Sequence, residues 1–174
     1  MTALARWSLA LALLGGCAAS STVQTRTTGD GTSFESQRVR LASRDMSGAI
    51  GVRDRVFWQA SASCAGPGCV PTEVDLAFVN GSDFELDVDP RKVEVTVDGL
   101  SRAWPNPDIP RDRIGQRIPR GEFLRITVSA DDFAQLAEAG EVRVAFGSTG
   151  TAPFVASRAS RAPFRDLARA ISAP

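Results

Sequence analysis

The stretch from Thr72 to Gly99 alternates apolar and polar residues over three successive runs. The apolar positions of these runs are Val74, Leu76, Phe78, Phe84, Leu86, Val88, Val93, Val95 and Val97. Because alternate side chains of a strand point to opposite faces, each run has one apolar face. The joints, Asn80-Gly81-Ser82 and Asp89-Pro90-Arg91, consist of turn-forming residues. The pattern predicts three consecutive strands whose shared apolar face needs a second layer to cover it.

Shorter alternating runs lie on both sides of this stretch. They occupy residues 37–43, 55–63, 122–129, 141–147 and 153–156. In contrast, residues 100–120 contain four prolines, so we expect an irregular loop with at most a short strand at 114–118. Together the runs predict a mainly all-β domain over residues 35–157, an antiparallel β-sandwich of seven to eight strands.

Two segments have helical periodicity instead. Ser129 is a suitable N-cap before an acidic first turn, and Gly140 is a suitable stop, so this segment predicts one short crossover helix. Residues 162–172 place a stripe of apolar residues on one side, which predicts a second helix within a C-terminal tail of residues 158–174. We expect this helix to dock on the domain; contact with a partner or with a membrane surface is the alternative.

The composition argues against several functions. The sequence has no histidine, which removes the usual Ser-His-Asp and Cys-His nucleophile systems and histidine-ligated zinc sites. Its formal net charge is zero, so no basic excess indicates nucleic-acid binding. We therefore expect a non-enzymatic protein without a cofactor or metal, although carboxylate-based or redox catalysis remains an alternative.

The N-terminus has the features of a secretory signal. A basic residue, Arg6, precedes an apolar run at 7–14 that is too short to span a bilayer, and small residues follow it directly. The ending Leu14-Gly15-Gly16-Cys17 resembles the lipobox of bacterial lipoproteins. That resemblance implies a signal peptide at residues 1–16, cleavage before Cys17 and acylation of Cys17, which anchors the protein to a membrane of the bacterial cell envelope. A plain secretory signal is the alternative.

Two features follow from this export signal. The residue after Cys17 is Ala18 rather than Asp, which in lipoproteins of this kind favours the outer membrane, facing the periplasm. Residues 17–34 are rich in Ser, Thr, Gly and Ala with almost no apolar residues, so we expect a flexible tether. An irregular edge packed on the domain is the alternative for this segment.

The remaining cysteines, Cys64 and Cys69, flank a Gly-Pro-Gly sequence that turns the chain tightly. In an oxidising compartment this spacing predicts a structural disulfide that closes a loop between two strands. A redox centre or a metal site is the alternative, but the Cys-x-x-Cys spacing and the further ligands for zinc are absent from the sequence.

The strand number and spacing, and the helix between two strands, resemble the immunoglobulin-like domains of bacterial envelope proteins. This resemblance implies an immunoglobulin-like sandwich. The short spacing of Cys64 and Cys69 departs from antibody domains, in which two distant cysteines bridge the sheets.

Candidate contact residues gather in the proline-rich loop. They are Trp104, Arg102, Arg111, Arg113 and Arg117. Trp and Arg are frequent anchors of protein interfaces, so we interpret this loop as an interaction surface. The alternative is that Trp104 and Ile109 pack back over the edge of the sandwich.

A second hypothesis is a periplasm-facing protein that binds a carbohydrate or a small ligand. Trp58 or Trp104 would then contact the ligand, and four acids on one strand face could attract Ca²⁺. The acids are Asp83, Glu85, Asp87 and Asp89. Their wide spacing along a strand instead favours a solvated edge that prevents aggregation. The leading hypothesis is a lipid-anchored envelope protein that binds another envelope protein, or cell-wall material, without catalysis, through the sandwich edge or the proline-rich loop.

Overall fold

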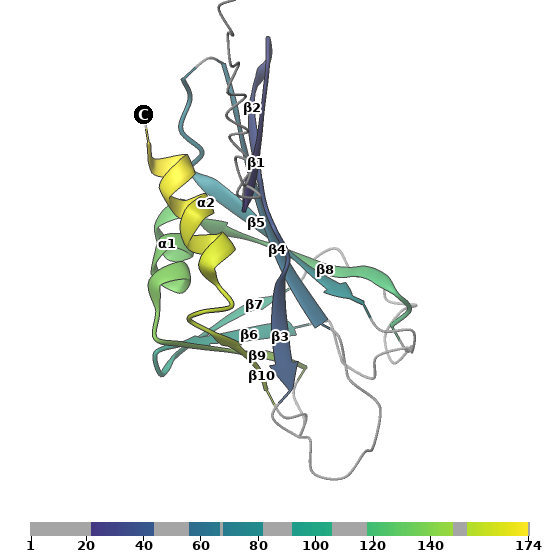
Figure 1. Cartoon of the computed structure of the whole chain (residues 1–174). Helices are drawn as coiled ribbons and strands as arrows, with labels where there is room; N and C mark the ends of the chain where they lie inside the picture. Colours follow the sequence, from purple (N-terminus) through teal and green to yellow (C-terminus); the bar gives the residue numbers. More distant parts are fainter. Residues whose placement is uncertain are drawn as a thin grey trace, which may run out of the picture.

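The computed structural model describes residues 22–43, 56–66, 68–81, 92–105, 118–147 and 153–173. Within these ranges the chain forms ten strands and two helices (Figure 1). The strands are β1 (Val23–Thr28), β2 (Gly31–Ser36), β3 (Val39–Ser43), β4 (Val56–Ala65), β5 (Glu73–Asn80), β6 (Lys92–Val97), β7 (Leu100–Pro105), β8 (Gly121–Ser129), β9 (Glu141–Phe146) and β10 (Phe154–Ser157). The helices are α1 (Ala130–Glu138) and α2 (Ala162–Ser172).

The strands form two antiparallel layers. The first layer has the order β1-β2-β4-β5-β8, and the second has the order β7-β6-β9-β10-β3. β3 joins the layers because its first residues pair with the start of β4 and its last residues pair with β10. The predicted antiparallel β-sandwich is therefore confirmed, but the described ranges hold ten strands instead of the predicted seven to eight, because β1, β2 and β7 were not predicted. The immunoglobulin-like assignment stays a prediction.

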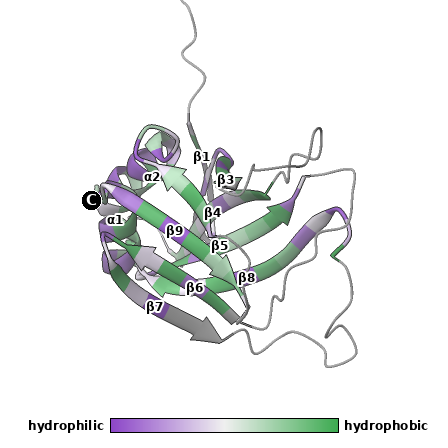
Figure 2. Ribbon diagram, turned by 90° about the horizontal axis from the view of Figure 1, so that it is seen from below, coloured by the Kyte–Doolittle hydropathy of each residue, from purple (hydrophilic) through white to green (hydrophobic). Residues whose placement is uncertain are grey.

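The strand faces follow the sequence pattern, whereas the strand neighbours do not. Val74 and Leu76 of β5 and Val93 and Val95 of β6 are fully buried, as the alternation indicates. Figure 2 shows the same alternation of apolar and polar residues along β8 and β9. However, β5 pairs with β4 and β8, and β6 pairs with β7 and β9. β5 and β6 thus enclose one core from opposite layers. The expected strand between them, at 84–88, lies outside the described residues.

An aromatic cluster forms the centre of the core. Trp58 of β4 has 0% of its surface exposed and stacks on Phe78, with ring centroids 5.1 Å apart. Phe164 of α2 meets the same indole edge-on at 5.4 Å and also contacts Phe133 of α1. Both helices lie on the same side of the molecule (Figure 1). The docking of the C-terminal helix on the domain is thereby confirmed, and Trp58 is a core residue.

The predicted tether is wrong for residues 23–34. β1 and β2 form a hairpin, and β2 pairs with the second half of β4, so the first layer gains two strands. The hydroxyl of Ser36 is buried and accepts a hydrogen bond from the backbone N–H of Ala60 at 3.0 Å, while Phe34 packs partly against the core. The composition indicates that this segment does not fold alone. Pairing of β2 with β4 supplies hydrogen-bond partners for its backbone N–H and C=O groups, and its threonines favour extended structure.

The proline-rich region also begins with an unpredicted strand. β7 pairs with β6 along its whole length through a two-residue turn at Asp98 and Gly99. Both turn residues have positive φ, 47° and 88°, which is the conformation that tight hairpin turns of type I′ require. Asp-Gly is the usual sequence of such turns, so the signal was present in the sequence. Residues 106–117 lie outside the described ranges.

Both predicted helices are present at the predicted positions. The hydroxyl of Ser129 accepts a hydrogen bond from the backbone N–H of Asp132 at 3.1 Å and caps α1. α1 carries the chain from β8 in the first layer to β9 in the second, which confirms the crossover. Its buried residues Phe133, Leu136 and Ala137 face the core and α2.

Candidate functional site

The two ends of the sandwich have different connections. At one end, four connections join β3 to β4, β5 to β6, β7 to β8, and β9 to β10. The strand register brings their stems together: Val56 pairs with Asn80, Asn80 pairs with Gly121, and Lys92 pairs with Pro105. We call this the loop end. The opposite end, the closed end, has the turns at 29–30 and 98–99, the Cys64–Cys69 loop and the start of α1. Loops at one end of a rigid sandwich are a common location for binding.

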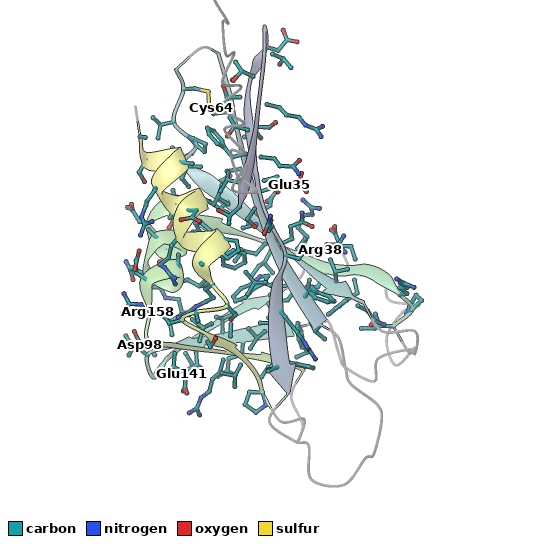
Figure 3. All side chains as sticks on the ribbon, in the orientation of Figure 1. Glu35, Arg38, Cys64, Asp98, Glu141 and Arg158 are labelled. Atoms are coloured by element: carbon teal, nitrogen blue, oxygen red, sulfur yellow. A yellow bond between two sulfur atoms is a disulfide. The ribbon has the colours of Figure 1, made fainter. Side chains whose placement is uncertain are left out.

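A hollow of about 490 Å³ lies at the loop end, on the outer face of the first layer. We call it the loop-end hollow, and it is lined by Arg38, Phe57, Gln59, Val79, Asn80, Gly81, Arg120, Gly121 and Glu122. Phe57 is half-buried and Val79 is 8% exposed, so these two residues form an apolar floor. Arg38, Arg120 and Glu122 are exposed around the floor. Figure 3 shows Glu35 and Arg38 on the side of the first layer opposite the helices.

A β-bulge shapes one wall of the hollow. Phe78 pairs with Leu124, but the next residue, Val79, pairs with Glu122, so Phe123 is the additional residue in β8. In an uninterrupted strand Glu122 would share the buried face of Leu124. The bulge instead exposes Glu122 and places the ring of Phe123 against the core rings of Phe78 and Phe146. The register shift therefore keeps a carboxylate out of the core and adds it to the hollow.

Hydrogen bonds position the polar residues around the hollow. The Nε–H of Arg38 donates to Gln59 Oε1 at 3.3 Å, and Gln59 Nε2 donates to Glu35 Oε1 at 2.5 Å. The fully buried Asn80 donates through Nδ2 to the backbone carbonyl of Ile118 at 3.1 Å. This last bond joins the end of β5 to the segment that enters β8, so it links the stems of two loops.

A charged network borders the same face. Arg125 donates to both carboxylate oxygens of Glu122, at 2.9 and 2.8 Å, and its Nη1 lies 3.6 Å from Asp75 Oδ2. The hydrogen bond to Glu122 raises the pKa of Arg125, as does the charge of the same carboxylate, against a smaller opposing effect of burial. Glu122, Arg125 and Asp75 thus form a charged group on the surface beside the hollow.

Among the predicted contact residues, the structure describes the side chain of Arg102 and the backbone of Trp104. Arg102 lies in β7, near the closed end, where it forms an ion pair with Asp132 at the start of α1. This hydrogen bond from Arg102, together with one from Ser129, lowers the pKa of Asp132. Trp104 lies in β7, and its backbone pairs with Val93. Arg111, Arg113, Arg117 and the predicted lipidation residue Cys17 lie outside the described residues.

The predicted disulfide is present between Cys64 and Cys69, with an S–S distance of 2.03 Å. It closes the connection from β4 to β5, as the sequence indicated, and it lies at the closed end. Gly31 of β2 approaches this region so closely that a Cβ atom there would lie 2.2 Å from the carbonyl oxygen of Cys64. The disulfide loop and the hairpin therefore pack as one unit.

The structure bears on the ligand-binding alternative in two ways. Trp58 is fully buried, so its proposed contact with a ligand is wrong. The four acids at 83–89 lie outside the described residues, and within the described ranges no three His, Cys, Asp or Glu side chains lie close enough to hold a metal ion. No described observation thus favours a carbohydrate or Ca²⁺ site.

Sequence reasoning missed the loop-end hollow because its residues come from four separate segments. One signal was available: Phe57 is an apolar residue on the face of β4 that otherwise carries Gln59, Ser61 and Ser63. A single partly exposed apolar residue is common on protein surfaces, so this signal alone did not mark a site.

Comparisons with protein-family models, curated proteins and solved structures found no match to this chain. Within the described ranges, neither helix is long and apolar enough to cross a membrane.

Proposed function

We propose that this protein is a lipid-anchored component of the bacterial cell envelope, at the outer membrane facing the periplasm, that binds another envelope protein without catalysing a reaction. The loop end of the sandwich is its contact surface. The observation that carries this proposal is that the strand ends flanking four connections lie at the same end of the sandwich as one hollow, which combines an apolar floor with exposed charged side chains. Such a combination is typical of interaction surfaces.

Two further features support the export of the chain. The lipobox-like sequence ends at Cys17, and the folded domain contains a disulfide, which persists in oxidising compartments such as the periplasm. The chain also lacks histidine, the commonest general acid–base residue, which supports a binding role.

Because β1 and β2 belong to the domain, the segment that links Cys17 to the domain is shorter than the sequence predicted. Thr22, the residue before β1, donates a hydrogen bond to Asp166 of α2, so Thr22 is already part of the packed domain. Thr22 follows Cys17 by five residues, which span at most about 18 Å when fully extended. An acylated Cys17 would therefore hold the domain close to the membrane surface, and its partner would be a protein within reach of that surface.

Site-specific photo-crosslinking in intact cells tests this proposal. A photo-reactive residue is placed at Pro119, which is exposed at the loop end, and in a matched variant at Val70, which is 52% exposed near the disulfide. We expect Pro119 to capture a reproducible envelope protein that Val70 does not capture. Mass spectrometry of the mature chain should show acyl groups on Cys17.

The C17S variant provides the control for the anchor. We expect it to lack the acyl groups and to lose the partner captured at Pro119. Capture of the same proteins from both positions would contradict the loop end as the contact surface. Unchanged membrane association of C17S would contradict the lipid anchor.

A further inference from the structure

The first layer ends in a strand that has one neighbour. β1 pairs with β2 along all six of its residues and, among the described residues, with no other strand. Its side chains from Gln24 to Thr28 are exposed, and the hairpin extends away from the strands of the second layer (Figure 1). An edge strand of this kind presents backbone N–H and C=O groups with which another extended chain can pair.

The strand register shows which backbone groups of β1 point outwards. The backbone N–H of Gln37 donates to the carbonyl of Thr22 at 2.8 Å, so these residues form a hydrogen-bonded pair of the ladder. Because such pairs alternate along an antiparallel ladder, Thr25 and Thr27 direct their N–H and C=O groups away from β2. Thr22 is held to Asp166 of α2, so the accessible part of the edge runs from Thr25 towards the hairpin tip.

The other edges of the two layers are less suited to pairing with another chain. β8 contains the bulge at Phe123, and β7 ends at Pro105, which has no N–H. Arg102 of β7 is also bound to Asp132 of α1. Bulges and prolines are features that prevent edge pairing. β1 has neither, its register with β2 is unbroken, and its one charged residue is Arg26.

The sequence of this edge suits a second copy of itself. Two β1 strands related by a two-fold axis are antiparallel, and their outward groups face each other when the axis passes through Thr27. Thr25 then lies opposite Gly29 of the second copy, where a Cβ would meet no atom within 4 Å. Arg26 lies opposite Thr28, so the two arginines are offset. An axis through Arg26 would instead place two like charges directly opposite each other, which is unfavourable.

The same arrangement agrees with the lipid anchor. The two-fold axis that joins two edges into one sheet is perpendicular to that sheet, so both copies present the same face to the same side. Thr22, five residues after Cys17, contacts α2, whereas Arg38 of the loop-end hollow lies on the opposite side of the first layer (Figure 3). Both anchors would therefore be tied to the helix side of the dimer, and both hollows would face the other side.

We propose that β1 is a dimerisation edge, to which a second copy of this chain adds its own β1 antiparallel, with Thr27 on the two-fold axis. The choice of a second copy rests on the proposed function, since anchors in one membrane plane raise the effective concentration of identical edges. The first layers of the two copies form one continuous sheet. The dimer displays two loop ends, and each of them contacts an envelope protein.

Photo-crosslinking in intact cells tests the pairing. A photo-reactive residue is placed at Thr25, opposite Gly29 of the second copy, and in a matched variant at Thr72, which is also exposed but lies outside β1. We expect Thr25 to give a covalent dimer that mass spectrometry identifies as this chain alone, and Thr72 to give none. C17S should lower the yield of the dimer at least about tenfold, because it removes the shared membrane plane.

Variants of the central residue then test the backbone contact. T27P removes the outward N–H on the axis, which β2 does not use, and should lower the yield of the dimer about tenfold. T27A keeps this N–H and should dimerise like wild type. T27K leaves the backbone unchanged but places two cations opposite each other, so it should also reduce the yield. Thermal unfolding establishes which variants are folded, and T27K decides the test if T27P is not.

The outcomes separate this inference from the proposed function. No dimer from Thr25, a different protein captured there, or an undiminished yield in T27K would overturn the dimerisation edge. A dimer that persists in C17S would support the edge and contradict the contribution of the anchor. If Thr25 gives the dimer but Pro119 captures no protein, the edge stands and the proposed envelope interaction is wrong. If Pro119 captures its partner and Thr25 gives no dimer, the proposed function stands without this edge.

Discussion

In the described residues of the sandwich, side chains hold the backbone of the closed end and that of the loop end in different ways. At the closed end, the carboxylate of Asp98 accepts hydrogen bonds from the backbone N–H groups of Gly140 and Glu141, and Arg161 donates to the carbonyls of Leu136 and Ala139. The turn after α1 is therefore held through both its donors and its acceptors. At the loop end, the corresponding bond among the described residues is that of Asn80 with Ile118.

This comparison indicates a division of roles. The closed end also contains the disulfide and the capped start of α1, so much of the specific polar structure that stabilises the fold lies there. Apart from the buried Asn80, the polar side chains described near the loop end lie on the surface, in the hollow and in the Arg125 network. Substitutions at the closed end should therefore reduce stability, while substitutions at the loop end should change binding.

Arg161 offers the strongest test of this division. Its side chain is fully buried, and the burial lowers its pKa, yet its described hydrogen bonds go to backbone carbonyls at the end of α1. R161A would leave those carbonyls unsatisfied and open a cavity, so we expect a loss of about 2–4 kcal/mol in the free energy of unfolding. Urea unfolding measures it. R161M restores the side-chain volume but no hydrogen-bond donor, so it should lose less stability than R161A. Wild-type stability in R161A would show that the hydrogen bonds from Arg161 to the end of α1 do not stabilise the fold.

The disulfide should have the next largest effect. Removing Cys64 and Cys69 together by C64S/C69S frees a short loop in the unfolded chain, for which the loop-entropy relation gives about 2 kcal/mol. The same loss should appear when wild type is treated with a reductant, which should leave the double variant unchanged. A variant that unfolds at the wild-type urea concentration would show that the hairpin and helices hold this end without the disulfide.

Two glycines of the hairpin form a matched pair for the third test. A Cβ at Gly31 would collide with the carbonyl oxygen of Cys64, whereas a Cβ at Gly29 would meet no atom within 4 Å. G31A should therefore cost about 1–3 kcal/mol and increase amide hydrogen exchange in β2, because the strand must move away from β4. G29A should be close to neutral. Equal effects would mean that the hairpin is not tightly held on β4.

Asp98 makes the closed end sensitive to pH. Hydrogen bonds from the backbone N–H groups of Glu141 and Gly140 lower its pKa from the ordinary value of 3.8. A lowered pKa in the folded state contributes stability that is present above the ordinary value and is lost as the pH falls through the folded value. D98N keeps a residue that tolerates positive φ, so it should melt below wild type at pH 7 and converge with wild type in acid. A difference in melting temperature that does not depend on pH would contradict this ionisation effect.

The smallest effect is expected beside the hollow. Arg125 is 47% exposed and its ion pairs with Glu122 and Asp75 are on the surface, so R125Q should change the free energy of unfolding by less than about 0.5 kcal/mol. Chemical denaturation at low and high salt measures the difference, which should shrink as salt is added. A loss as large as that of R161A would remove the contrast between the two ends.

The sequence predicted local structure better than it predicted the site. Val74, Leu76, Val93 and Val95 are buried as the alternation indicated, and α1 begins at its predicted cap. The loop-end hollow was not predicted, because Arg38, Phe57, Val79 and Arg120 belong to segments that only the strand pairing brings together. The predicted contact surface around Trp104 stays a prediction, although the register of β7 places Arg102 beside Asp132 of α1, which the sequence did not indicate.

The sequence by itself determined the faces of the strands, both helices and the short disulfide, because each depends on residues that are close together along the chain. The tertiary structure decided which strands are neighbours, since β5 and β6 have the same periodicity whether they pair or face each other. It also decided that a threonine-rich segment becomes a hairpin, because β4 supplies partners for its backbone, and that a bulge turns Glu122 outwards. These features depend on contacts between distant segments, which a local pattern does not encode.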